Sequence, residues 1–145
     1  MIAEHIYNSK NHIVLGGGTD YFLPIEGGGI REDGVDFVKK IKNNFHYLET
    51  KKDIDNFNYT DRKRIFGLFA DDDLERTEFE PNLLEMLDFS IKESKRMLAD
   101  GCKGFFIMAE GSKIDWASHN NDYEYYLKEM QEFEKTVENC LLYTS

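Results

Sequence analysis

The sequence predicts an α/β fold, in which a parallel or mostly parallel sheet carries helices on both faces. Short apolar runs of strand length alternate along the chain with longer segments that have the apolar spacing of helices. The run at residues 105–109 is apolar throughout, which is typical of a strand buried on both faces of a parallel sheet. Hydrophobic residues make up 41% and aromatic residues 14% of the 145 residues, which argues against intrinsic disorder.

The first half of the chain reads as helix 2–8, strand 12–15, a helix, and a short strand at 46–48. A glycine triplet at 16–18 follows the first strand and invites a phosphate-binding interpretation. Neither GxGxxG nor GxxxxGK[ST] is present, so we interpret this triplet and that at 27–29 as serving backbone geometry. Asp33 is placed to cap the following helix, which we expect to end near residue 43.

In the second half, residues 64–70 read as another buried strand, and the acidic run 71–73 as a solvated loop rather than a calcium site. Pro81 at a first helical position opens a long helix to about residue 99. The last helix starts at residue 121 or 122. Its packing face is predicted from a stripe with helical spacing, formed by Tyr126, Met130, Phe133 and Val137.

Charge and composition restrict the possible partners. The formal net charge is -10, from 18 basic and 28 acidic residues, which disfavours nucleic acid and anionic membrane surfaces. No apolar run approaches the ~20 residues of a membrane span, and no signal peptide follows Met1. Cys102 and Cys140 have no CxxC spacing, and we interpret both as structural.

The chemistry is expected where the apolar run 105–109 ends. Glu110 is the first polar residue after the run, and ligands of open α/β sheets collect beyond the carboxyl ends of the strands. His119 follows Asp115 by four positions, so a helix would place both on one face, one turn apart. Imidazole and carboxylate suit zinc, and an all-oxygen shell around Glu110 would suit magnesium. By spacing alone, a solvated surface pair at Asp115 and His119 is the favoured alternative.

Residues 104–122 read GFFIMAEGSKIDWASHNND. This stretch resembles the metal-binding segment of alkaline phosphatases, whose pattern is roughly G-F-F-L-M-V-E-G-x-x-I-D-x-x-x-H-x-N-D. The resemblance implies that Glu110 binds magnesium and that Asp115 and His119 bind one of two catalytic zinc ions. It also implies a three-layer α/β/α sandwich, of which this chain is a central slice.

Further segments agree with the family in the same order along the chain. Residues 14–18 with Phe22 are similar to V-x-L-G-G-G-x-x-x-F, and residues 31–34 to R-x-D-G. Residues 66–70 and 81–86 are similar to L-G-L-F and P-x-L-x-E-M-T, with Leu87 in place of the usual threonine. The resemblance extends to about residue 139, so we expect a partial catalytic domain over 1–139 and a truncated or non-native tail over 140–145.

Several family segments have no counterpart in this sequence. The family's nucleophilic serine, its phosphate-binding arginine and a further magnesium-binding carboxylate lie upstream of the glycine-triplet strand, and its T-A-D-H-E segment and last zinc-binding histidine lie downstream. We therefore expect no catalytic nucleophile here, and an internal fragment that is inactive alone.

For the parent enzyme, the resemblance implies phosphomonoester hydrolysis through a phosphoserine, with two Zn²⁺ and one Mg²⁺. It further implies small phosphate monoesters as substrates, a homodimer, and a periplasmic or secreted location. Two alternatives stay open: a related phosphodiesterase, sulfatase or phosphomutase on the same scaffold, or a non-catalytic fragment.

Overall fold

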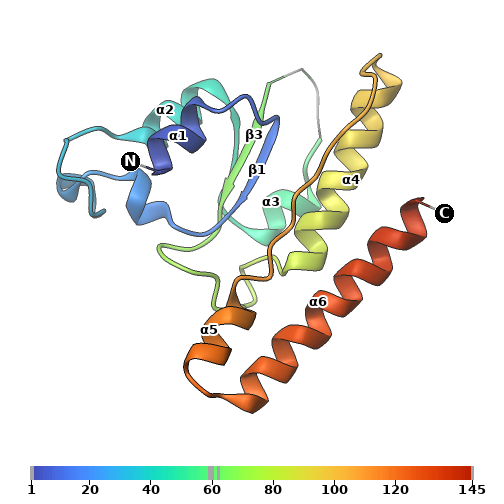
Figure 1. Ribbon diagram of the computed structural model, residues 1–145. Helices are drawn as coiled ribbons and strands as arrows, with labels where there is room; N and C mark the ends of the chain where they lie inside the picture. The colour runs from blue at the N-terminus through green and yellow to red at the C-terminus, as the bar shows by residue number, and fades with distance from the viewer. Residues whose placement is uncertain (1, 59–60, 62, 145) are drawn as a thin grey trace. The chain divides into compact units, whose positions relative to one another are not determined.

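The structure is a computed structural model that describes residues 2–58, 61 and 63–144. The chain divides into two compact units, Met1–Pro81 and Asn82–Ser145, and each is described by itself. The first unit contains the sheet. The second contains three helices and the segment expected to carry the site (Figure 1).

The first unit is built on a parallel three-stranded sheet. Its strands are β1 (Ile13–Gly16), β2 (His46–Leu48) and β3 (Ile65–Leu68), in the spatial order β1-β3-β2. Ile65 pairs with both Ile13 and His46, so β3 is the central strand. All four β3 residues are buried, which confirms the buried strand predicted from the apolar run at 64–70.

Helices flank this sheet. α1 (Ile2–Asn8) and α2 (Phe37–Asn44) lie together on one side of β1 and β3, and α3 (Lys51–Asp55) lies beyond their other side (Figure 1). Two 3-10 turns, η1 (Thr19–Phe22) and η2 (Ile25–Gly27), follow β1. Phe66 is at the centre of the core, where Phe22 and Phe45 meet it edge-on with ring centroids 5.5 and 5.7 Å away.

Two helix starts differ from the prediction. Asp36, not Asp33, caps α2, by accepting a 2.8 Å hydrogen bond from the Lys39 backbone N–H. Asp33 instead accepts a 3.1 Å hydrogen bond from Nε of the buried Arg31, and it does not cap the helix. The long helix α4 (Leu83–Ala99) begins after Asn82, whose side chain forms a reciprocal capping box with Glu85, so Pro81 precedes the helix.

The second unit contains α4, α5 (Lys113–His119) and α6 (Tyr123–Thr144). α4 and α6 run side by side in the same direction, and residues 102–112 return from the end of α4 to the start of α5 (Figure 1). The Tyr143 hydroxyl donates a 2.6 Å hydrogen bond to Asp88 Oδ1, which links α6 to α4. α6 continues through residues 140–144, and the predicted boundary after residue 139 stays a prediction.

The prediction of a buried strand at residues 105–109 was wrong. This segment has no regular secondary structure, and Phe105, Phe106 and Met108 are 48%, 90% and 80% exposed. A parallel strand is stable only when neighbouring strands accept and donate its backbone hydrogen bonds. Within the described residues the sheet consists of β1, β3 and β2, so this segment pairs with no strand.

The predicted packing stripe of the last helix was only partly correct. Tyr126 and Phe133 are half-buried, whereas Met130 and Val137 are 38% and 42% exposed. The most buried α6 side chains are instead Glu129 and Thr136, at 7% and 2% exposure. α6 therefore packs through a face that includes polar side chains.

Candidate functional site

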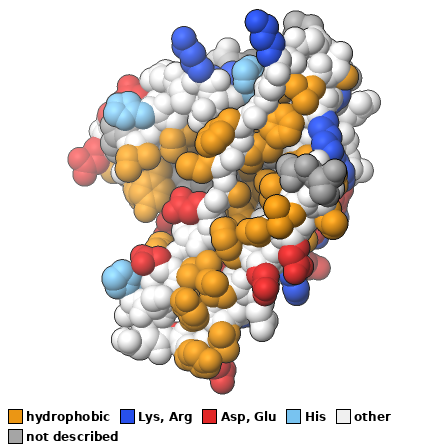
Figure 2. All heavy atoms as spheres, turned by 45° about the vertical axis from the view of Figure 1, so that its right-hand side comes forward, with side chains coloured by type: hydrophobic (Ala, Val, Ile, Leu, Met, Phe, Trp, Pro, Cys, Tyr) orange, Lys and Arg blue, Asp and Glu red, His pale blue; other side chains and the backbone are white. Residues whose placement is uncertain are grey.

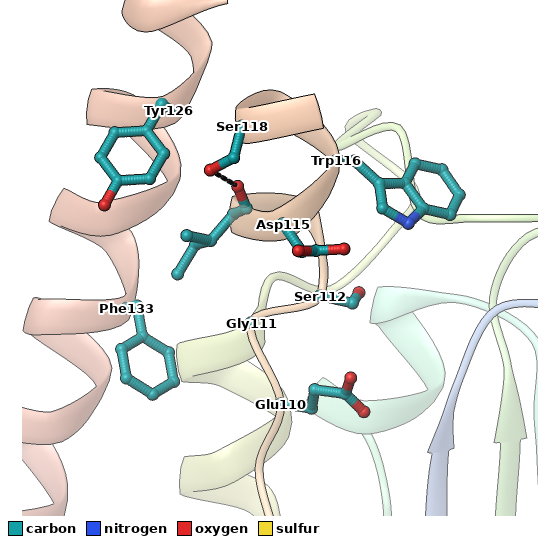
Figure 3. Close-up of a pocket in the computed structure, with 9 residues that line it drawn as sticks. Glu110, Gly111, Ser112, Asp115, Trp116, Ser118, Tyr126 and Phe133 are labelled. Carbon is teal, nitrogen blue, oxygen red and sulfur yellow. Dashed lines mark hydrogen bonds between the residues drawn. The ribbon is translucent and has the colours of Figure 1, made fainter. Parts of the chain in front are cut away.

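The three predicted ligands lie at the junction between the return segment and α5. Glu110 ends the extended segment, Gly111 and Ser112 follow, and α5 then carries Asp115 and His119. Glu110 and Asp115 line the same open cavity of about 530 Å³ beside α6. Figure 3 shows their carboxylates on the side of the segment that faces away from Tyr126 and Phe133.

Gly111 is required by close packing at this junction. A Cβ atom there would lie 2.9 Å from Cδ2 of Phe133 on α6 and 3.2 Å from Cδ1 of Ile114. Only a residue without a side chain allows the backbone to pass so near the Phe133 ring. The glycine after Glu110 thus lets the chain approach α6 as it enters α5.

The predicted one-turn spacing of Asp115 and His119 is confirmed. Both belong to α5, and Asp115 Oδ2 lies 3.4 Å from His119 Nε2. Their side chains are 73% and 79% exposed, so an ion pair between them contributes little stability. This pair is therefore available to bind a ligand without loss of core packing.

The donor set fits a zinc ion. Zinc bonds to nitrogen and oxygen measure about 2.0–2.2 Å, so two donors on one tetrahedral ion lie about 3.3–3.5 Å apart. The 3.4 Å between Asp115 Oδ2 and His119 Nε2 falls in this range. Within the described residues no group of three or more His, Cys, Asp or Glu side chains is close enough to form a metal site by itself.

A tight turn connects α5 to α6. Asn121 adopts a left-handed conformation with φ of 54°, the Asn121 N–H donates to the Ser118 carbonyl at 3.1 Å, and the Asp122 N–H donates to the Ala117 carbonyl at 3.0 Å. This is a Schellman ending for α5. The Asp122 carboxylate then accepts from the Tyr125 N–H at 3.0 Å, which caps α6.

Sequence reasoning missed a polar contact between α5 and α6. The Tyr125 hydroxyl lies close enough to Lys113 on α5 and to Glu129 on α6 for both charges to act on its pKa. Burial raises the pKa of Tyr125, the negative charge of Glu129 raises it further, and Lys113 partly offsets the rise. The available signal was the spacing of Tyr125 and Glu129, which places them one turn apart on α6.

The other histidines belong to the first unit, and both cysteines belong to the second. His5 and His12 belong to the first unit, as does His46, which forms a 2.8 Å contact with Asp61. Neither Cys102 nor Cys140 forms a disulfide within the part of the chain that the structure describes. No helix among the described residues is long and apolar enough to cross a membrane.

A parallel sheet flanked by helices defines the class as a partial α/β fold, and the second unit adds a Glu-Gly turn that leads into a helix bearing Asp and His one turn apart. Residues 1–145 match the model of the Alkaline phosphatase family. The chain therefore belongs to the alkaline phosphatase family.

Curated relatives agree with this assignment. Alkaline phosphatase 3 of Bacillus subtilis is 34% identical over 145 residues, covering 95% of this chain and 28% of that protein. The alkaline phosphatase of Schizosaccharomyces pombe is 33% identical over 135 residues, covering 87% of this chain and 25% of that protein. The chain thus spans about a quarter of the length of these relatives.

Solved structures show the same fold. Alkaline phosphatase from the Antarctic bacterium TAB5 superposes with a TM-score of 0.77 at 27% identity, over 98% of this chain and 39% of that chain. The Thermus thermophilus enzyme gives 0.78 at 26% identity, over 96% of this chain and 29% of that chain. The prediction of an alkaline phosphatase-like α/β fold is confirmed. A variant of the TAB5 enzyme was solved with magnesium bound, and its TM-score to this chain is 0.72 at 26% identity.

Proposed function

We propose that this chain supplies part of the active site of a metal-dependent phosphomonoesterase that acts through a phosphoserine. Asp115 and His119 would hold one catalytic zinc ion, and Glu110 would hold magnesium. The observation that carries the proposal is the 3.4 Å separation of Asp115 Oδ2 and His119 Nε2 on one face of α5. Membership of the alkaline phosphatase family supports it.

The residues of this chain would bind the metal ions and hold them in place. Asp115 would supply an anionic oxygen and His119 a neutral nitrogen to the same ion, and His119 must be deprotonated to do so. Bound metal ions would bring positive charge to a phosphate group in a chain whose formal charge is -10, and would favour deprotonation of water and serine. The serine nucleophile itself is not predicted in this sequence, so the chain alone would not complete the reaction.

Zinc binding tests this assignment. Purified chain, and the product of the complete reading frame that encodes it, would be titrated with zinc against a chromophoric chelator. Asp115→Ala and His119→Ala should each weaken zinc binding by more than the roughly 10–100-fold typical for loss of a ligand's hydrogen-bond partner. Asp55→Ala and His5→Ala, which change the same residue types on α3 and α1, should bind zinc as the unsubstituted chain does.

Hydrolysis of p-nitrophenyl phosphate would be measured on the same two proteins. We expect turnover from the longer product only, and its loss in Asp115→Ala. Wild-type turnover in that variant would contradict the ligand assignment. Bound zinc without phosphatase activity would favour the related phosphodiesterase, sulfatase or phosphomutase activities. The homodimer and the periplasmic or secreted location remain predictions from the family.

A further inference from the structure

The indole ring of Trp116 lies beside the proposed metal ligands. Trp116 follows Asp115 on α5, and it lines the same cavity as Glu110 and Asp115. Figure 3 shows its ring on the side of α5 that also carries the two carboxylates, away from Tyr126 and Phe133. An aromatic face and two carboxylates therefore border the same space.

The core of the second unit does not take up this ring. Trp116 is 49% exposed, whereas Ala117, the next residue of α5, is fully buried. Tryptophan side chains are highly buried on average, because their large apolar surface gains much from leaving water. Half of the Trp116 indole is therefore available to contact a ligand in the cavity.

A phosphate monoester bound to metal at Asp115 and His119 would bring its leaving group to this ring. The leaving group is joined to phosphorus through a single oxygen atom, so an aryl ring lies next to the phosphate. Consecutive Cα atoms are about 3.8 Å apart, so the indole side chain begins one residue from the proposed ligand Asp115. Aromatic side chains are common in the walls of ligand pockets, and flat aromatic groups stack on them.

We propose that Trp116 is a specificity-determining residue that stacks against the leaving group of aryl phosphate monoesters and favours them over alkyl phosphate monoesters. The inference rests on the proposed function and names its preferred class of substrate. A glycerol leaving group presents hydroxyl groups instead of a flat ring, so it gains no stacking on the indole.

Kinetics on the product of the complete reading frame test this preference, with phenyl phosphate and glycerol phosphate as substrates. Trp116→Leu keeps an apolar side chain and removes the ring. In this variant kcat/KM for phenyl phosphate should fall about 10-fold more than kcat/KM for glycerol phosphate. Trp116→Phe, which keeps an aromatic ring, should restore most of the difference.

This comparison has two controls. Both substrates report on the same folded protein, so partial unfolding of a variant does not change the ratio of the two kcat/KM values. Tyr123→Leu removes a ring that is 70% exposed on α6, and its ratio should equal that of the unsubstituted protein. An equal loss for the two substrates in Trp116→Leu would overturn the inference.

Fluorescence gives a readout that does not depend on turnover. The chain contains one tryptophan, so its tryptophan emission reports on Trp116 alone. p-Nitrophenyl phosphate should quench the emission of the zinc-loaded chain to saturation, because a nitrophenyl ring stacked on the indole accepts an electron from its excited state. Inorganic phosphate has no ring, so it should not quench and should reverse the quenching by competition. Quenching that does not saturate, or that phosphate does not reverse, would overturn the inference.

The two proposals fail in different ways. Zinc binding that Asp115→Ala abolishes, together with an equal loss for both substrates in Trp116→Leu, would overturn the role of Trp116 and leave the proposed function standing. Absence of zinc binding in the unsubstituted chain and in the complete reading-frame product would overturn the proposed function, and the role of Trp116 with it.

Discussion

Arg31 shows how one buried charge organises the loop after β1. It is 1% exposed, and its guanidinium donates to both carboxylate oxygens of Asp33 and, at 3.2 Å, to the Tyr21 carbonyl. The same guanidinium lies 4.5 Å from the centre of the Phe37 ring. These contacts satisfy a charge that would otherwise be costly to bury.

The pairing makes stability depend on pH through Asp33. The Arg31 hydrogen bond, followed by that from the Val35 N–H, lowers the pKa of Asp33. A carboxyl with a lowered folded-state pKa contributes stability that is present above its unfolded pKa and is lost as pH falls through the folded one. We therefore expect the thermal unfolding midpoint to decrease as the pH is lowered from about 5 to about 2. The decrease should be smaller in Asp33→Asn, which has no carboxyl group to protonate at this position.

Thermal unfolding followed by circular dichroism at a series of pH values checks this prediction. Asp55→Asn, at an exposed position of α3, should follow the unsubstituted chain. If the midpoint decreases equally at low pH in the unsubstituted chain and in Asp33→Asn, protonation of Asp33 does not cause the loss of stability.

At the scale of elements, the hairpin of α5 and α6 depends on Asn121. Its left-handed φ of 54° allows the Schellman hydrogen bonds that end α5 before Asp122 caps α6. Asparagine tolerates this conformation better than most residues with a side chain, and glycine tolerates it best. The turn sets where α6 begins relative to the helix that carries Asp115 and His119.

Asn121→Ala should destabilise this hairpin by about 1 kcal/mol, because alanine strongly disfavours the left-handed conformation. Asn121→Gly should be neutral or stabilising. Asn120→Ala is a matched control, since Asn120 has a φ of -80°, which alanine adopts freely. Urea unfolding monitored by far-ultraviolet circular dichroism measures the difference. Equal midpoints for the two alanine variants would show that the Asn121 conformation does not limit stability.

At the scale of the whole molecule, exposed apolar side chains are numerous. Figure 2 shows hydrophobic side chains over much of the visible surface. Phe106 and Met108, at 90% and 80% exposure, belong to the return segment, and Leu141 and Leu142, at 61% and 77%, lie near the end of α6. Exposed apolar surface of this kind promotes association.

Phe106→Ser should reduce self-association of the chain, because it removes the most exposed aromatic ring of the apolar run. Sedimentation velocity over a range of concentrations measures this. Phe79→Ser removes a ring that is 59% exposed outside the return segment and should have a smaller effect. Equal self-association in the two variants would show that the return segment is not the main contact.

Much of the fold was predictable from local sequence patterns. The continuous apolar run at Ile65–Leu68 predicted the central strand, and helical apolar spacing predicted α2, α4 and α6. The spacing of Asp115 and His119 predicted that they face each other, because a helix brings residues four apart onto one face. These features depend on short-range geometry, which the order of residues determines.

Tertiary structure alone decided the rest. Residues 105–109 have the composition of a buried strand, but a strand also needs neighbours, and no strand among the described residues pairs with them. Asp33 was predicted to cap α2, but its carboxylate is hydrogen-bonded to the buried Arg31 instead. Glu129 is only 7% exposed although a glutamate is usually at the surface, because contacts between helices decide which side of α6 is buried, and these cannot be read from the pattern of one helix.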